Sequence, residues 1–350
     1  MKTMDCELII ECDARHLQQV YTGLLLLEQQ GLLRLHVTFL KPKIKRSLCT
    51  VKLADKVLVF DMHDAEKFYA DVLPQCDLYF KRSYSSEAAA QTGYADKIKA
   101  YGLNYHILPD YFTSLYLRKT LAYYGIKDAC KYLIKKVDKT QRWHFEPTIR
   151  NMVAPPELIK EPRILFMARV WDHEYDVDFE MTPEFSEERL VMNEVRANCI
   201  RALKKEFGTL FTGGLEHSDY AKKHFKDCLA NVPSQTSKRN YIQLVKQHPI
   251  CISTAGLNQS IGWKFAEYVC LSRAIVSERL AFEVPGPFDK NQNYLEFSSV
   301  DDCVEAVTQL VNVPEKAERM MQANADYYQQ YVRPDALIKN CLQHVHQTNG

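Results

Sequence analysis

Short apolar runs alternate with longer stretches of helical spacing along the first 150 residues. The runs that predict strands cover residues 7–12, 36–40, 56–60, 78–80 and 105–108. Apolar residues at helical spacing fill 17–30 and 65–72. Strands that alternate with helices are typical of a parallel sheet covered by helices. The first half therefore predicts an α/β domain.

A further helix is predicted over residues 111–136, where aromatic and basic side chains alternate with leucine and isoleucine. Tyr116, Lys119, Tyr132 and Lys136 belong to this pattern. A basic amphipathic helix of this kind lies on anionic membrane surfaces. The same stripe also packs on its own domain in many proteins, so both interpretations stay open.

Three prolines within residues 151–162 interrupt both periodicities and predict a linker. The alternation then restarts, which indicates a second α/β domain. Its predicted strands cover 163–168, 209–212, 250–253 and 274–277, and its helices cover 187–207, 220–229, 238–247 and 263–271. The last helical stretch runs over 300–347 with breaks near Pro314 and Pro334. The two alternating regions together predict two α/β domains in tandem.

Composition agrees with this reading and narrows the class of protein. With 350 residues, 46% of them hydrophobic and 25% charged, the chain can fold into about two globular domains. No apolar run approaches the roughly 20 residues that span a bilayer, and acidic residues occupy the place of a signal sequence. Eleven cysteines without a C-x-x-C pair indicate neither a disulfide framework nor a zinc site. We expect a reduced, cytoplasmic protein.

The net charge of +1 conceals an asymmetry between the halves. Residues 1–150 hold 23 Lys and Arg against 17 Asp and Glu, and the remainder holds 22 against 27. The halves are therefore +6 and −5. An excess of this size does not predict nucleic-acid binding, but it favours an anionic acceptor or membrane surface, unless it is only a solvated basic surface.

The most informative stretch, residues 250–278, predicts a strand, a polar glycine loop, a helix and a second strand. Such a loop lets the backbone approach a ligand, and the start of the helix offers N–H groups to a diphosphate. Lys264 on the first turn adds a positive charge, and Glu267 offers acceptors to a ribose diol. The alternative is an ordinary exposed Lys264–Glu267 pair on a helix whose glycines only make a turn. The candidate binding residues of the loop are Thr254, Gly256, Ser260 and Gly262.

The sequence Ser260-Ile-Gly-Trp-Lys-Phe-Ala-Glu-Tyr, followed by Ala274-Ile-Val-Ser-Glu, resembles the donor-binding segment of group 1, family 4-like glycosyltransferases of the GT-B fold. In that family a helix beside the sugar-nucleotide diphosphate carries a ribose-binding glutamate, which Glu267 matches. The resemblance spans roughly residues 160–325. It implies that Arg169, after the first strand of this half, reaches the donor phosphates. It also implies that Gly213 and Gly214 allow the chain to pass closely around the donor.

One departure from the family pattern concerns the donor sugar. The commonest pattern has two glutamates separated by seven, but Gln259 stands eight residues before Glu267 and Leu271 stands seven before Glu278. Neutral hydrogen bonds from Asn258, Gln259 and Ser260 would replace the acidic contact and suit a different sugar.

The first half resembles GT-B acceptor domains in architecture only. Residues at the carboxyl ends of its predicted parallel strands face a ligand crevice. The candidates to deprotonate an acceptor hydroxyl are Asp13, Asp61 and His63, and the candidates to bind the acceptor are Lys81 and Arg82. Capping or surface roles are the alternative at each of these positions. The sequence leaves open whether the reaction inverts or retains the sugar's configuration, and a retaining enzyme has no need of a base.

The chain is therefore expected to be a metal-independent glycosyltransferase without a cofactor. The resemblance implies two Rossmann-like domains facing across a cleft: an acceptor domain over 1–155, a nucleotide-sugar domain over 156–325, and a helix over 326–350 that returns to the first domain. Asp176-Val-Asp178 matches the D-x-D metal signature of the other large glycosyltransferase fold, but so short a motif arises by chance. We predict that the anionic donor is bound by Arg169, Lys264 and the helix start.

The expected acceptor is a glycan or a lipid-linked glycan of bacterial surface polysaccharide synthesis, with possible peripheral contact with the cytoplasmic face of the inner membrane and with no nucleic-acid partner. The competing enzyme is a sugar-nucleotide epimerase or hydrolase of the same fold. The competitor from another class is a non-catalytic nucleotide-sugar-binding subunit of an assembly complex. Donor turnover separates an enzyme from the subunit, and acceptor dependence separates a transferase from an epimerase or hydrolase.

Overall fold

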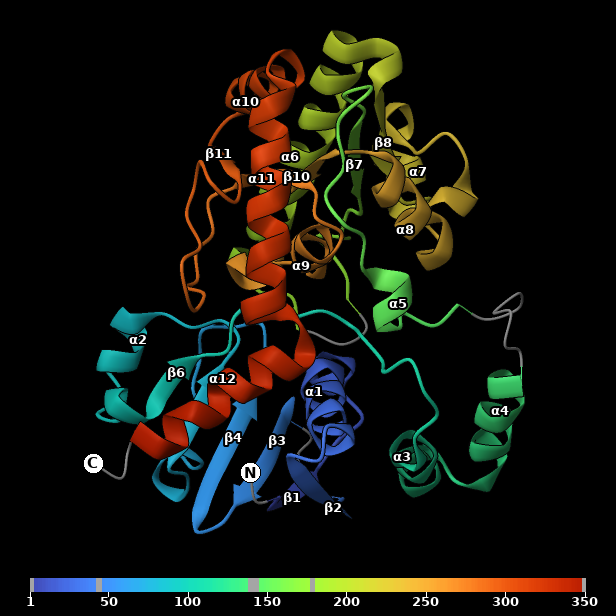
Figure 1. Ribbon diagram of the computed structural model, residues 1–350. Coiled ribbons are helices and arrows are strands. Elements are labelled where there is room, and N and C mark those ends of the chain that lie inside the picture. Colours follow the sequence, from blue (N-terminus) through green and yellow to red (C-terminus); the bar gives the residue numbers. More distant parts are fainter. Residues whose placement is uncertain (1–2, 42–45, 138–144, 177–179, 348–350) are drawn as a thin grey trace. The chain divides into compact units, whose positions relative to one another are not determined.

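The computed structural model describes residues 3–41, 46–137, 145–176 and 180–347, and it divides into two compact α/β units (Figure 1). Unit 1 comprises Met1–Val153, Phe282–Gly286 and Tyr328–Gly350. Unit 2 comprises Ala154–Ala281 and Pro287–Tyr327. The predicted fold class of two Rossmann-like α/β regions is confirmed.

Unit 1 is built on a six-stranded sheet of order β2-β1-β3-β4-β5-β6. Its strands are β1 (Met4–Ile10), β2 (Leu33–Phe39), β3 (Leu48–Leu53), β4 (Lys56–Asp61), β5 (Leu78–Lys81) and β6 (Ile98–Ala100). Strand β3 runs antiparallel to both of its neighbours, β1 and β4, while the other pairs are parallel. The sheet is therefore mixed, and the prediction of a purely parallel sheet is wrong at β3.

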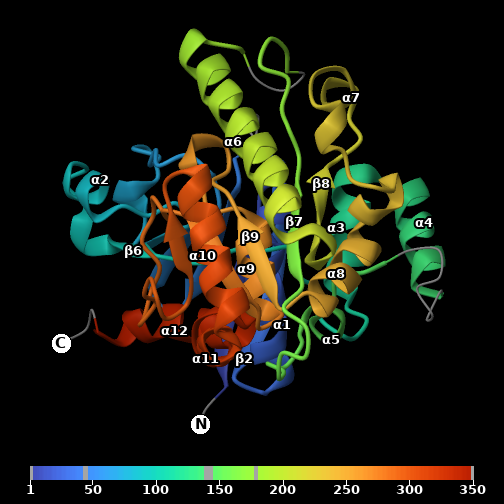
Figure 2. The same ribbon diagram turned by 90° about the horizontal axis from the view of Figure 1, so that it is seen from above.

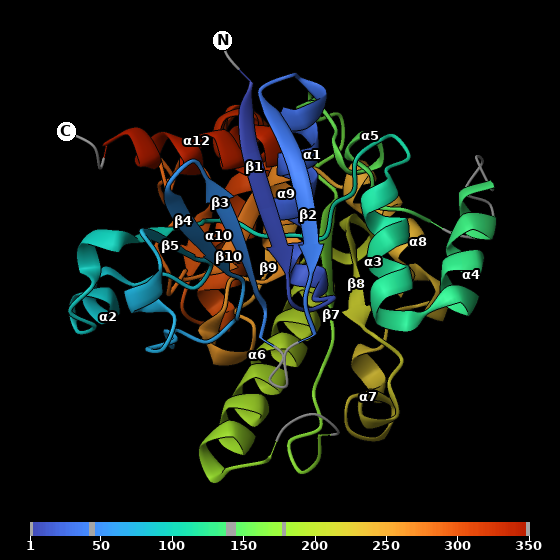
Figure 3. The same cartoon turned by 90° about the horizontal axis from the view of Figure 1, so that it is seen from below.

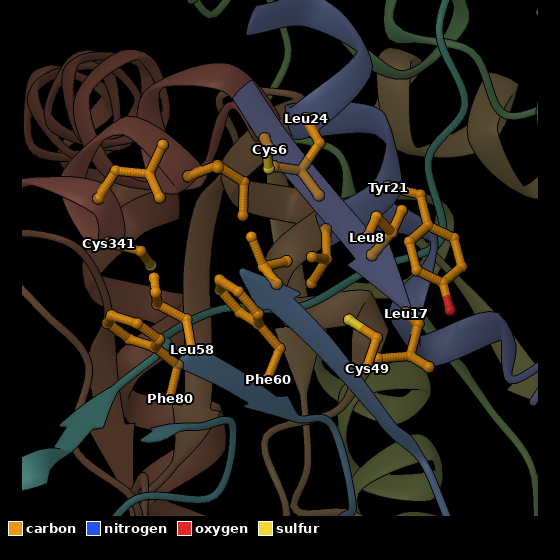
Figure 4. Packing of buried hydrophobic residues seen from close by; sticks show 14 of the residues in the cluster. Cys6, Leu8, Leu17, Tyr21, Leu24, Cys49, Leu58, Phe60, Phe80 and Cys341 are labelled. Atoms are coloured by element: carbon orange, nitrogen blue, oxygen red, sulfur yellow. The ribbon is translucent and has the colours of Figure 1, made fainter. Parts of the chain in front are cut away.

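One face of this sheet is covered by helices from the two ends of the chain. The core cluster joins α1 (Gln18–Gln29) and α12 (Pro334–Gln347) to β1, β3, β4 and β5. Figure 4 shows Cys341 of α12 among Leu58, Phe60 and Phe80 of the sheet. Helix α12 thus returns to the N-terminal region, as expected. A five-residue π-helical turn, Tyr328–Val332, leads into it.

Two predictions for unit 1 are wrong. Residues 65–72 have helical spacing but form no helix, because Phe68 and Tyr69 pack on the cluster around Tyr79 and Ile98. The short helix α2 (Ser86–Ala90) completes this layer. Residues 105–108 are buried and extended but make only an isolated bridge at Leu108, so the edge strand is β6 instead.

The predicted helix over 111–136 consists of two helices, α3 (Ser114–Tyr124) and α4 (Ile126–Val137). Gly125 divides them with φ of 83°, a backbone conformation that favours glycine. Helix α3 packs beside β2, and α4 packs on α3 (Figure 3). A single turn, α5 (Ile149–Met152), ends this part of unit 1.

Unit 2 has a fully parallel five-stranded sheet of order β11-β10-β9-β7-β8. Its strands are β7 (Ile164–Ala168), β8 (Phe211–Leu215), β9 (Ile250–Ser253), β10 (Ala274–Glu278) and β11 (Leu295–Phe297). Four of the five were predicted to within three residues, and β11 was not. Its helices are α6 (Pro183–Phe207), α7 (Asp219–His224), α8 (Lys238–Gln247), α9 (Trp263–Cys270), α10 (Val300–Asn312) and α11 (Pro314–Tyr327).

Both faces of the unit 2 sheet are buried. Even-numbered residues such as Phe166 and Ile252 share a core with α6 and α10, which lie side by side (Figure 2). Side chains alternate along a strand, so the equally buried Leu165, Cys251 and Ile275 face the opposite side. This double burial explains the continuous apolar runs that predicted the strands. Among the described residues, no helix is both long and apolar enough to span a bilayer.

Candidate functional site

The order of the unit 2 strands reverses at β7. From β7 the chain continues to β8 on one side, and it then returns to β9 on the other. In open α/β sheets ligands bind outside the carboxyl ends of the strands at such a reversal. Arg169 follows β7 and Thr254 follows β9, so these two predicted residues belong to this point of the fold. We call the loops that follow β7 and β9, with the side chains that contact them, the unit 2 switch site.

Arg196 of α6 holds the loops of the switch site together. Its Nε lies 3.0 Å from Thr254 Oγ1, and its two terminal nitrogens donate to the carbonyls of Arg169 and Ala255, each at 2.7 Å. Burial lowers the pKa of Arg196 to about 10, although the nearby Glu278 carboxylate opposes this shift. A nearly buried guanidinium that ties β7 to β9 is a fixed positive charge at the reversal point.

Sequence reasoning missed Arg196 because it lies in the middle of a long helix, far from any motif. The available signal is its place on the buried side of α6, among Met192, Ala197 and Ile200. An arginine inside an apolar stripe is costly unless it has partners, so it marks a constrained position.

Lys264, on the first turn of α9, reaches back to β7, where its ammonium group donates to the carbonyl of Met167. Burial and the charge of Arg196 lower the pKa of Lys264 to about 7, against the opposing influence of Glu267. The group therefore exists in both protonation states near neutral pH. An anion that arrived here would shift it to the charged state.

Glu267, one turn further along α9, is almost completely buried and forms an ion pair with Lys238 at the start of α8. The Lys238 ammonium also lies 5.4 Å from the ring centre of Tyr241. The structure thus brings Lys264 and Glu267 to one side of α9, as their spacing predicts, but adds a lysine that the sequence pattern did not identify. The simple alternative of an exposed Lys264–Glu267 pair does not describe this burial.

The glycine loop between β9 and α9 has a tight and unusual backbone. The Gly256 N–H donates to the Ser260 carbonyl at 2.8 Å, and a side chain at Gly256 would collide with Ser260 Oγ at 2.6 Å. Asn258 and Gln259 both adopt left-handed backbone angles, with φ of 56° and 55°. Consecutive non-glycine residues in this conformation cost free energy and are concentrated at functional sites.

A small cavity of about 10 Å³ lies beside this loop. Thr254, Ser260 and Gly262 line it from β9 and the start of α9, and Glu278 lines it from the end of β10. The Glu278 carboxylate accepts a hydrogen bond of 2.8 Å from the Ala255 N–H, which fixes the loop. A cavity of this size has room for about one water molecule, so it is not by itself a ligand pocket.

The remaining predicted donor residues have structural partners of their own. A side chain at Gly213 would meet the Phe166 carbonyl at 2.5 Å, and one at Gly214 would meet the Ala230 nitrogen at 2.4 Å. Close packing therefore gives a reason for both glycines that needs no ligand. Arg169 is exposed and stacks on Trp171, with 3.7 Å between its guanidinium carbon and the ring centre. Burial of part of its side chain lowers the pKa of Arg169.

The D-x-D sequence does not form a described metal site. Asp178 lies outside the described residues, and Asp176 is paired with the buried Arg189 of α6. Within the described ranges, no cluster of three or more His, Cys, Asp or Glu side chains is arranged to hold a metal ion.

Unit 1 has its own reversal of strand order at β1, between β2 and β3. There His16, after β1, meets Asp64, after β4, with 4.0 Å between Nε2 and Oδ2. The buried Arg82, after β5, forms an ion pair with Asp64. Exposed His63 directly precedes Asp64 in the chain. Burial and the charge of Arg82 lower the pKa of His16 to about 4, so this imidazole is neutral at physiological pH. His16 and Asp64 were not predicted.

Asp61 and Lys81 are both fully buried and form an ion pair of 2.9 Å. The Tyr79 hydroxyl donates to the same Asp61 carboxylate oxygen at 2.6 Å, and the backbone N–H of His63 donates to the other Asp61 oxygen at 2.9 Å. Asp13 is paired with Lys119 of α3. The predicted residues His63 and Arg82 thus come together with Asp64, whereas Asp61 and Lys81 lie beneath them and have their own structural partners.

Neither a scan against protein-family models nor a search of curated proteins finds a match for the sequence. Among solved structures, the chain is similar to HepE from Anabaena in complex with UDP and glucose, with 12% identity, a TM-score of 0.36, and 98% of this chain and 99% of that chain covered.

Two other solved structures are similar to parts or all of the chain. UDP-GlcNAc 2-epimerase from Neisseria meningitidis bound to UDP-GlcNAc has 12% identity, a TM-score of 0.39, and coverage of 98% and 100%. The C-terminal domain of a glycosyl transferase group 1 family protein from Francisella tularensis has 10% identity and a TM-score of 0.35, and it covers 53% of this chain and 97% of its own. The chain's own residues, not these similarities, support the assignment of function below.

Proposed function

We propose that the protein is a glycosyltransferase that binds a nucleotide-sugar donor at the unit 2 switch site. The observation that carries this proposal is the convergence of Arg196 and Lys264 on the reversal point of the sheet, next to the buried carboxylate of Glu267. Two cations and the N–H groups at the start of α9 suit a diphosphate. A carboxylate one turn further along suits a ribose diol. Together they match a nucleoside diphosphate in charge and order.

The chemistry that this arrangement supports is departure of the nucleoside diphosphate from the sugar. Negative charge grows on the leaving diphosphate as the glycosidic bond breaks, and fixed positive groups stabilise that charge. Lys264 gains its full charge as the anion forms, because its pKa of about 7 rises beside a phosphate. Arg169, exposed on Trp171, is free to supply a third cation. These cations are proposed to replace a metal ion, so turnover is expected to persist in EDTA.

The polar group of unit 1 is proposed to bind the acceptor. The pKa of about 4 makes His16 a weak base. Exposed His63 is therefore proposed as the group that accepts a proton from an acceptor hydroxyl if the reaction inverts configuration. Buried Arg82, paired with Asp64, orients that carboxylate toward His16. A glycan or lipid-linked glycan of surface polysaccharide synthesis fits the basic charge of the first 150 residues.

The first test is binding of nucleotides and nucleotide sugars to the wild type, followed by thermal shift. A ligand that binds only the folded state raises the melting midpoint. We expect one nucleoside diphosphate to raise it, and we expect Lys264→Met and Glu267→Gln to reduce that shift. Lys223→Met, an exposed lysine of α7, is the matched control and should behave as wild type. If no nucleotide shifts the folded wild type, the donor assignment is wrong.

Turnover assays then separate the competing functions. A transferase consumes the donor only when an acceptor is present. An epimerase or hydrolase consumes it alone, and a non-catalytic subunit binds it without turnover. Donor consumption without an acceptor would replace the transferase by one of the first two alternatives.

Donor affinity is expected to depend on pH through Lys264. The free protein holds this lysine half protonated near pH 7, and the bound diphosphate favours the charged form. Affinity is therefore highest below pH 7 and falls about 15-fold between pH 7 and 8.5, because the charged fraction of Lys264 in the free protein falls from about one half to about 3%. Isothermal titration in buffers of different ionisation enthalpy should show proton uptake. An unchanged affinity over this range, or one that remains equally steep in Lys264→Met, would contradict the role of Lys264.

A further inference from the structure

Exposed apolar side chains are concentrated in and beside the α3–α4 hairpin of unit 1. Six of the thirteen exposed large hydrophobic side chains among the described residues lie within 112–134. Ile126 and Ile134 are 75% and 71% exposed. The six are Phe112, Leu121, Tyr124, Ile126, Leu133 and Ile134. Contiguous exposed apolar groups of this kind mark an interaction surface.

Helix α4 has three faces rather than two. Its buried face carries Ala129 and packs on α3. Ile126, Leu133 and Ile134 follow helical spacing on a second, exposed face. Lysines 127, 131 and 135, spaced by four, form an exposed stripe that borders this apolar face. An apolar face and a basic stripe that are both exposed distinguish α4 from an ordinary surface helix.

Charge indicates what covers this surface. Lys119 and Lys136 are paired with Asp13 and Glu146 outside the two helices. The exposed charges of residues 111–137 are then Arg118, Lys127, Lys131 and Lys135 against Asp128, so the hairpin presents +3 (4 − 1). A second copy of the chain would bring its own lysine stripe against this one, and like charges repel. Anionic lipid headgroups attract the lysines, while the acyl region accepts the isoleucine and leucine side chains.

We infer that the exposed face of α4, with the adjoining end of α3, docks unit 1 on an anionic membrane surface. The helix lies in the plane of the interface, with Ile126, Leu133 and Ile134 immersed and the lysines at the level of the phosphates. This inference does not depend on the donor site of unit 2. It predicts binding to vesicles whether or not the protein turns over a nucleotide sugar.

The chain offers a probe for this face. Cys130, on α4 between Ile126 and Ile134, is exposed, and the other ten cysteines are buried. An environment-sensitive fluorophore on Cys130 therefore reports on α4 itself. With vesicles of phosphatidylcholine and phosphatidylglycerol, we expect a blue shift and an increase in emission. Vesicles of phosphatidylcholine alone should leave the spectrum close to that of the free protein.

Two pairs of substitutions test the two halves of the surface by vesicle sedimentation. Lys127→Gln with Lys135→Gln should weaken binding about 30-fold, since each lysine near an anionic surface contributes about a factor of five. Ile126→Ser with Ile134→Ser should weaken it by at least about tenfold through lost apolar burial. Because all four side chains are exposed, both variants keep the fold. The matched control, Lys223→Gln with Lys226→Gln on unit 2, should bind as wild type.

Each outcome decides the inference. A fluorophore response together with loss of binding in both variants supports it. Sedimentation without a fluorophore response, or binding unchanged in the variants, would show that another surface contacts the lipid and would overturn it. Absence of binding to anionic vesicles would overturn it as well. So would concentration-dependent self-association that the isoleucine substitutions abolish, because the face would then be an interface between copies.

Discussion

We expect removal of residues 328–350 to prevent unit 1 from folding, while unit 2 remains folded. The removed segment contributes Leu337, Ile338, Cys341, Leu342 and Val345 to the unit 1 core. Full burial of each such side chain stabilises by about 1.5–3 kcal/mol, so five give roughly 8–15 kcal/mol. A whole domain has a net stability of only about 5–15 kcal/mol. Limited proteolysis should therefore cleave the residues of unit 1 rapidly and leave a resistant fragment from unit 2.

A rejoined variant separates loss of α12 from loss of the rest of the chain. Residues 1–153 connected by a flexible glycine-serine linker to 328–350 contain both helices that cover the sheet, α1 and α12. This variant should resist proteolysis where 1–153 alone does not. If 1–153 alone resisted proteolysis equally well, α12 would be dispensable for the unit 1 core.

Asp61→Leu is expected to destabilise the protein by about 3–5 kcal/mol, which is the usual cost of leaving one member of a buried ion pair without its partner. Lys81 is fully buried, and its other hydrogen bond is to the His63 carbonyl at 3.3 Å. Burial already lowers the pKa of Lys81, and the Asp61 carboxylate is the first of the groups that oppose this shift, followed by Asp64. Urea unfolding followed by circular dichroism measures the loss.

The control removes all three polar groups at once. Asp61→Leu with Tyr79→Phe and Lys81→Met leaves neither a charge nor a hydroxyl unpaired, so most of the stability should return. If this triple variant is stable and still turns over the donor, Asp61 acts only by supporting the loop that carries His63 and Asp64. A stable triple variant without turnover would instead restore Asp61 as a group that touches the reactants.

The sequence predicts the elements of unit 2 well because burial is uniform there. Residues 250–253 were predicted as a strand and form β9 with the same bounds, since a short apolar run that is followed by a polar glycine loop favours a strand over a helix. Unit 1 is harder to predict because contacts between distant segments, and not the local pattern alone, determine its elements. In strand β3, buried Val51 and Leu53 alternate with exposed Lys52. The Lys52 ammonium forms an ion pair with Glu7 of β1 on the polar face of the sheet. Residues 65–72 form no helix, because Phe68 and Tyr69 pack on the cluster around Tyr79 and Ile98.

The candidate site was predictable where one segment supplies it. Lys264 and Glu267 share a helix, and their spacing places them on one side of α9. Arg196 comes from α6 and Lys238 from α8, and no local spacing relates either residue to α9. The same holds for His16 and Asp64, which meet only because β1 and β4 end at one edge of the unit 1 sheet. Contacts between distant segments are a property of the fold.

The return of α12 to unit 1 also sets an order of events during synthesis. The sheet and α1 of unit 1 leave the ribosome first, but Ile338 and Val345 follow more than 180 residues after Val153. At a translation rate of about 5–20 residues per second, the apolar face of the nascent sheet remains exposed for roughly 10–40 s, until α12 is synthesised. Unit 2 has all its strands before α12 exists, so it is expected to fold first on the ribosome. The segment made first is the one that needs a chaperone.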